Sequence, residues 1–196
     1  MRLFGRLFRL IWGADVEPAL RPLLAVSFVG TATFSAGWSF VGIWAIQELG
    51  ATSKQLGVAY LIAAVAGFAA GYLGGHASDY VGRRPMILLG WALLAATFLA
   101  YTFVGHHVWL GLGLASLAGI GGSIGGGADQ AMVAFGSMGA VGFALGPFIG
   151  LQLRGAYGDG AAWYFFAAVS LVAAATGAAA VRGATRRRVA PATVGY

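Results

Sequence analysis

The stretch Gly74–Pro85 reads GGHASDYVGRRP and separates two long apolar runs of the chain. It places an aspartate, two arginines and several glycines at one point, whereas its flanks are almost free of charge. Short charged segments between apolar runs are typical of the water-exposed loops that connect membrane-spanning helices. The stretch therefore predicts a turn between two spans, and the composition of the whole chain supports this interpretation.

Charged residues are too few in this chain for a water-soluble surface. The 196 residues are 59% hydrophobic and 9% charged, whereas soluble domains carry roughly 25% charged residues. The 33 glycines and many alanines suit close helix packing in lipid, where apolar burial does not drive association. The composition predicts an all-α fold, a polytopic helical membrane protein whose partner is the lipid bilayer.

Six apolar segments are long enough to cross a membrane. A helix needs about 20 apolar residues to span a hydrocarbon core of about 30 Å, and it satisfies its backbone groups internally. Ser53 is expected to cap the second helix, and Pro85 suits the first turn of the third. The expected spans are Leu23–Gln47, Gln55–Gly75, Met86–Gly105, Val108–Gly127, Met132–Leu153 and Ala161–Val181.

Basic residues alternate strongly between the connecting segments. Cytoplasmic loops carry an excess of Lys and Arg, and only Lys54 and Arg154 fall in segments of the other side. Both termini are therefore expected to be cytoplasmic, in a multi-pass protein of the cell membrane. Trp109, Trp163 and Tyr164 are then expected near the outer headgroups. The cytoplasmic set is Arg2, Arg6, Arg9, Arg21, Arg83, Arg84, Arg182, Arg186, Arg187 and Arg188.

Three regions follow from this topology. Residues 1–21 are expected to form an amphipathic helix at the cytoplasmic interface, because arginines interrupt their apolar pattern; a disordered basic tail is the alternative. Residues 22–182 form the six-helix transmembrane domain, and residues 183–196 form a basic cytoplasmic tail.

Several function classes have little support in the sequence. The net charge of +6 comes mostly from the termini and the opening loop, not from a basic face, so no nucleic acid is expected as a partner. The chain has no cysteine, and its three histidines are expected at opposite membrane boundaries, so no metal or other cofactor is expected. No nucleophile with a base is visible at spanning depth, which argues against an enzyme.

The charged loop has a regular spacing, Gly75-x3-Asp79-x2-Gly82-Arg83-Arg84. Gly82 permits a tight reversal, because glycine tolerates a positive φ. Asp79 can pair with an arginine or cap the following helix.

This spacing resembles the signature loop of the major facilitator superfamily, G-x3-D-x2-G-R-R between the second and third spans. The segment ELGATSKQLG is similar to the first outer loop of the same family. The resemblance implies an alternating-access transporter. It also implies a gating role for Gly75, Asp79, Gly82, Arg83 and Arg84, in which the three charged residues latch neighbouring helices.

A second glycine pattern lies in the fifth expected span, GAVGFALGPFIG. Gly142, Gly146 and Gly150 recur every four residues on one helix face, and Pro147 removes one backbone donor, so close packing and a bend are expected. The pattern also resembles G-x3-G-P-x2-G of family antiporters, while plain helix packing is the alternative. Gly67, Gly71 and Gly75 give the second span a similar face.

The chain departs from the family in three ways. Full transporters have about twelve spans in two halves, whereas six are expected here. Ala115 stands where many proton-coupled members carry an arginine, and no acidic residue lies within a span, so proton coupling is not supported. The inner segment between the fourth and fifth spans is very short, which suggests an internally shortened transporter joined near Ala134–Phe135.

The most polar face of the first span marks a candidate substrate path. Hydroxyls alternate with aromatic rings there, and serines of the fourth span are expected to complete it; helix packing is the alternative. The predicted function is transport of a small organic solute or drug-like compound, as a homodimer or with a partner half. A non-transporting remnant or assembly partner is the alternative function. The path residues are Thr31, Phe34, Ser35, Trp38, Ser39, Ser116 and Ser123.

Overall fold

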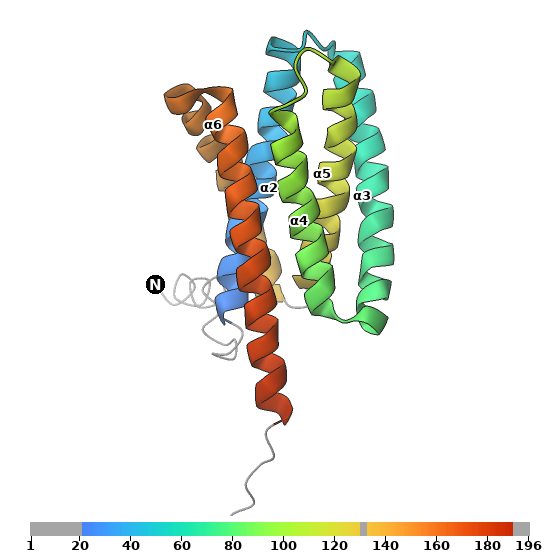
Figure 1. The fold of residues 1–196 in the computed structure, drawn as a ribbon, viewed down its shortest axis with the longest axis vertical. Coiled ribbons are helices and arrows are strands. Elements are labelled where there is room, and N and C mark those ends of the chain that lie inside the picture. Colours follow the sequence, from blue (N-terminus) through green and yellow to red (C-terminus); the bar gives the residue numbers. More distant parts are fainter. Residues whose placement is uncertain (1–20, 130–132, 190–196) are drawn as a thin grey trace, which may run out of the picture.

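The chain folds into an elongated bundle of antiparallel helices (Figure 1). The computed structural model describes residues 21–129 and 133–189, which form five helices and short connecting turns. The helices are α2 (Arg21–Gln47), α3 (Ser53–Val81), α4 (Arg83–Tyr101), α5 (Val108–Asp129) and α6 (Val133–Val189). Helix α6 is broken at Gly158, where φ is +79° and ψ is 175°. Its two arms run in opposite directions, and the second extends beyond the neighbouring helices (Figure 1).

The described helices have the lengths and composition of a helical membrane protein. Four apolar stretches are long enough to cross a membrane, and the last contains the break at Gly158. The apolar stretch Val108–Ile124 of α5 is shorter. The four long stretches are Ser27–Gln47, Ser53–Val81, Arg83–Tyr101 and Val141–Ala179.

The turn at Gly82 agrees with the sequence, but the cap of α3 does not. Gly82 separates α3 from α4 with φ +95°, a value that favours glycine, and Pro85 lies in the first turn of α4. The N-cap of α3 is Thr52, not Ser53. Thr52 accepts a hydrogen bond from the backbone N–H of Gln55 (3.3 Å), and its own N–H donates to Gln55 Oε1 (2.9 Å), which completes a capping box.

Several helix ends differ from those expected. Helix α3 continues to Val81, so the segment after Gly75 is its last turns and not a loop. Helix α4 ends at Tyr101, and the chain turns before Gly105, whose φ is +60°. The proposed join at 134–135 falls in the first turn of α6 and stays a hypothesis. Of the N-terminal helix predicted over 1–21, residues 1–20 lie outside the described residues, as do the residues from 190 on.

Three helix pairs, α2–α6, α3–α5 and α4–α5, make close backbone contacts. The first arm of α6 packs on α2, and α3 packs on α5, while α4 contacts both α5 and α6. A Cβ added to Gly146 would lie 2.7 Å from Ala36 N, and one added to Gly119 would lie 2.9 Å from Ala63 O. No side chain fits at these points without moving a backbone, so the glycines set how near the helices approach.

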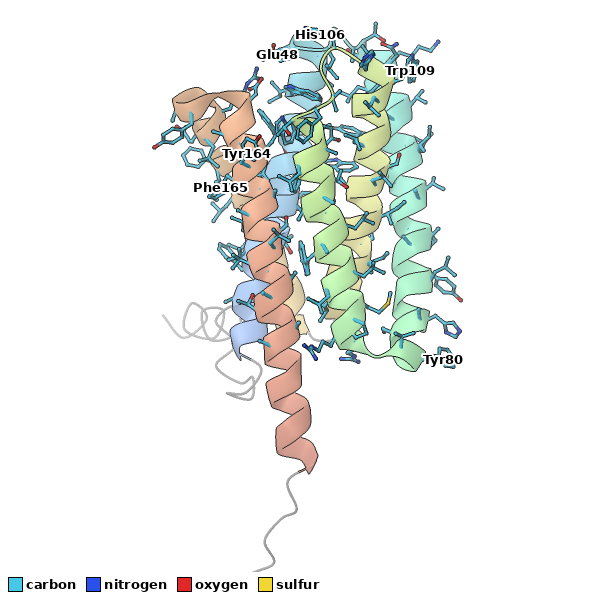
Figure 2. All side chains as sticks on the ribbon, in the orientation of Figure 1. Glu48, Tyr80, His106, Trp109, Tyr164 and Phe165 are labelled. Atoms are coloured by element: carbon cyan, nitrogen blue, oxygen red, sulfur yellow. The ribbon has the colours of Figure 1, made fainter. Side chains whose placement is uncertain are left out.

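An aromatic core fills the end of the bundle near the α2–α3 loop. Trp163 stacks on Tyr101 with 4.5 Å between ring centroids, and it also contacts Phe40 at 4.4 Å. Trp163 is 2% exposed, so its predicted place among the headgroups was wrong. The exposed Trp109 and Tyr164 remain compatible with an interfacial position (Figure 2).

Candidate functional site

The segment Gly75–Arg84, which we call the signature loop because of its resemblance alone, lies at the end of the bundle where α3 turns into α4 at Gly82. Tyr80 marks this end in Figure 2, opposite Glu48 and His106. Asp79, Arg83 and Arg84 are exposed, and among the described side chains none of them forms an ion pair. Asp79 also does not cap α4, whose N-cap is Gly82 without a side-chain hydrogen bond. The structure therefore shows the sharp reversal at Gly82, whereas the latch formed by the three charged residues stays a prediction.

The glycine face of the first arm of α6 lies directly against α2. Cβ atoms added to Gly142 and Gly146 would collide with the backbone oxygens of Phe28 and Ala32, and one added to Gly150 would lie 3.1 Å from Ala36 O. The same arm contains Pro147, which cannot donate to the carbonyl of Phe143 four residues earlier. The Ser35 hydroxyl of α2 donates to that carbonyl instead, at 2.7 Å. Ser35 thus replaces the hydrogen bond that Pro147 removes.

A cavity of about 510 Å³ opens between the helices on the half of the bundle nearer the signature loop. Its volume falls within the range of small-molecule sites, roughly 300–1,000 Å³. Side chains and backbone of all five described helices line it. The lining residues are Thr31, Phe34, Gly67, Phe68, Gly71, Tyr72, Trp91, Gly122, Ser123 and Phe143.

Three of the seven predicted path residues line this cavity: Thr31, Phe34 and Ser123. Ser35 instead faces α6, and Ser39 and Ser116 are half-buried outside the lining. Sequence reasoning missed the aromatic residues on α3, α4 and α6. The four-residue glycine spacing of α3 was the available signal, because Gly67 and Gly71 form part of the cavity wall.

An aromatic stack lies beside the cavity on the side of the α2–α3 loop. Trp38 stacks on Tyr60 with 4.8 Å between centroids, and Phe34 lies 5.5 Å from Trp38. The Tyr60 hydroxyl donates to the backbone oxygen of Trp38 at 2.9 Å, which ties α3 to α2. Toward the α2–α3 loop, the stack is followed by the aromatic core around Trp163. The bundle is therefore densely packed at that end and hollow toward the other.

A cluster of polar side chains around Arg154 joins three segments at the densely packed end of the bundle. Arg154 Nε donates to Asp159 Oδ1 at 2.8 Å, and Nη2 donates to Glu48 Oε1 at 3.2 Å. Nη1 donates to Gln47 Oε1 at 2.6 Å, and the guanidinium carbon lies 5.7 Å from the centroid of the Phe40 ring. The cluster connects the end of α2 with both sides of the break at Gly158. Sequence reasoning had used Arg154 only as an outer-loop charge.

No three His, Asp or Glu side chains within the described ranges are placed to hold a metal ion. No protein-family model, curated protein or solved structure matches this chain.

Proposed function

We propose that the chain is a half-size secondary transporter that moves a small organic solute or drug-like compound by alternating access. The observation that carries the proposal is the G-x3-D-x2-G-R-R segment at a sharp reversal between two long apolar helices, with Gly82 at positive φ. In the major facilitator superfamily, which this segment resembles, the corresponding loop stabilises one conformation of the transporter. Gly75, Asp79, Gly82, Arg83 and Arg84 would form the gating loop here.

The distribution of basic residues supports a definite orientation. Arg83 and Arg84 lie at the end of the bundle where α2 begins and where the second arm of α6 finishes (Figure 1). Lys54 and Arg154 lie at the other end. By the positive-inside rule, the arginine-rich end is cytoplasmic. The arms of α6 then count as the fifth and sixth spans of a six-span protein in the cell membrane.

In this orientation the cavity lies in the cytoplasmic half of the bundle. The Trp38–Tyr60 stack and the Arg154 cluster close the outer end, whereas the cavity lies on the cytoplasmic half. This arrangement corresponds to an inward-open half in alternating access. The absence of an ion pair at Asp79 among the described residues fits that state, because the latch would form when the inner side closes.

A second copy of the chain would supply the other wall of the path. Transporters of this kind bind substrate between two six-helix halves. Apolar side chains 65% to 80% exposed follow one face of α3 beside the cavity, at Leu61, Phe68 and Tyr72. They offer either a lipid-facing surface or a contact with another half. The rival function, a non-transporting remnant or assembly partner, is favoured by the six expected spans and by the very short segment between the fourth and fifth of them.

The gating role is tested by replacing Asp79 in the purified protein reconstituted into proteoliposomes. We expect Asp79→Asn to reduce protein-dependent solute flux by at least about tenfold, because the amide cannot form the charge-assisted hydrogen bonds of the carboxylate. Asp79→Glu should retain part of the flux, and Tyr80→Phe, an exposed neighbour, should retain nearly all of it. Unchanged flux in a correctly inserted Asp79→Asn protein would remove the loop from the mechanism.

A further inference from the structure

The cavity combines aromatic walls with two hydroxyls that have no hydrogen-bond partner among the described residues. Most buried hydroxyls of the described helices donate to a carbonyl one turn earlier, as Thr33, Thr97 and Ser170 do at 2.8 Å. Thr31 and Ser123 line the cavity and make no hydrogen bond with any residue that the structure describes. Thr31 belongs to α2 and Ser123 to α5, so hydroxyls from two helices are available for hydrogen bonds with a bound molecule.

Five aromatic side chains and three glycines form the rest of the described lining. Phe34, Phe68, Tyr72, Trp91 and Phe143 come from four different helices. Trp91 is 2% exposed, and its Nε1 has no acceptor within the described part of the chain. Aromatic walls favour flat apolar ligands through offset or edge-to-face contacts. A polar group on such a ligand would hydrogen-bond to the hydroxyls of Thr31 and Ser123.

Charge is missing from the described lining of the cavity. None of the lining residues within the described part of the chain is Asp, Glu, Lys or Arg. A charged ligand would lose its hydration without gaining a counter-ion, and this cost is high at membrane depth. Cation–π attraction returns only about 0.5–2 kcal/mol. The chemistry of the walls thus disfavours both cations and anions.

We propose that this cavity binds an uncharged, planar aromatic compound whose single polar group hydrogen-bonds to Thr31 and Ser123. The proposal rests on the transport function, since it assigns the ligand class to the same path. Binding to one half does not require flux, and the two proposals are therefore tested separately.

The cavity can be filled from Gly71 without displacing its neighbours. A Cβ at this position would lie 3.5 Å from Ser123 Cβ, an ordinary contact, so the Gly71→Leu side chain extends into the cavity. Gly57 lies on the same helix and meets nothing within 4 Å. Gly57→Leu is consequently the matched control, with the same added side chain in open space outside the cavity.

The test measures equilibrium binding of 2-naphthol to the full chain in nanodiscs at neutral pH, with empty nanodiscs subtracted. We expect saturable binding that Gly71→Leu weakens at least about tenfold and Gly57→Leu leaves unchanged. The Thr31→Val/Ser123→Ala pair preserves the cavity shape and should weaken binding about three- to tenfold. The cationic 2-naphthyl-trimethylammonium and the anionic 2-naphthoate should bind at least about tenfold more weakly than 2-naphthol.

Three results would overturn the proposal: no saturable 2-naphthol binding, equal binding by the two leucine variants, or tighter binding of a charged analogue. The hydroxyl pair also covers the case in which Gly71→Leu does not fold, because unchanged binding by that pair removes the assigned polar contact. Saturable 2-naphthol binding without any solute flux would contradict the transport function but would still support the binding site. Flux of another solute without 2-naphthol binding would contradict only the ligand class.

Discussion

At the scale of single residues, Ser35 and Pro147 show how a hydroxyl from another helix replaces a backbone hydrogen bond that a proline removes. Pro147 has no N–H to offer the carbonyl of Phe143, and Ser35 on the facing helix donates to it at 2.7 Å. The close approach of α2 at Gly146 brings the two helices within reach of each other. The glycine spacing and the proline were visible in the sequence, but the partner was not, because 108 residues separate Ser35 from Phe143.

We predict that Ser35→Ala lowers the free energy of unfolding by about 1–3 kcal/mol, since it leaves the carbonyl of Phe143, whose hydrogen bond is partly buried, without a donor. The same substitution in a Pro147→Ala background should cost much less, because the alanine N–H can bond to Phe143. Thr33→Val is the control, since Thr33 donates to the carbonyl of Val29 within its own helix. SDS-induced unfolding in mixed micelles, followed by circular dichroism, measures each variant. Equal costs of Ser35→Ala in the two backgrounds would contradict this pairing.

At the scale of elements, the sequence predicted most of the helices but not which helices and side chains pack against one another. Hydropathy located the long apolar helices, and Gly82 and Pro85 located the reversal between α3 and α4. The cap of α3 was missed by one residue, because the choice between Thr52 and Ser53 depends on which backbone is extended. Trp163 was misplaced because its burial comes from long-range stacking on Tyr101. No local pattern carries that contact.

The Arg154 cluster fixes the ends of α2 and of both α6 arms, so its removal should loosen the closed end. We predict that Arg154→Met lowers the free energy of unfolding by about 1–3 kcal/mol. Lys54 is exposed and forms no ion pair among the described residues, so Lys54→Met should change that free energy by less than about 0.5 kcal/mol. Double-mutant cycles should give a larger coupling with Asp159→Asn than with Glu48→Gln. The Asp159 contact is shorter, 2.8 against 3.2 Å, and its carboxylate side chain is less exposed, 27% against 51%. The reverse order of couplings would contradict this ranking.

At the scale of the whole molecule, the bundle has a dense end and a hollow end. The aromatic core, the Trp38–Tyr60 stack and the Arg154 cluster occupy the first, and the cavity and the signature loop occupy the second. The sequence predicted the charge asymmetry and three residues of the cavity wall. It could not predict the cavity itself, because Phe68, Trp91 and Phe143 meet there only through helix packing.

The proposed orientation predicts which end of the bundle reaches the cell exterior. The chain has no cysteine, so single-cysteine variants give an unambiguous label. We expect a membrane-impermeant maleimide to label His106→Cys on intact cells, and to label Tyr80→Cys only after permeabilisation. Both residues are exposed and lie at opposite ends (Figure 2). Labelling of Tyr80→Cys on intact cells would invert the topology and place the signature loop outside.

The central claim, a half-size transporter that needs a second half, is tested most directly by the native mass of the purified chain in nanodiscs, with lipid subtracted. We expect two 20.0 kDa chains per particle, which together would provide twelve spans and both walls of a central path. One chain per particle, at every protein concentration tested, would leave the cavity with a single wall. That result would contradict transport by this chain alone and favour the non-transporting alternative.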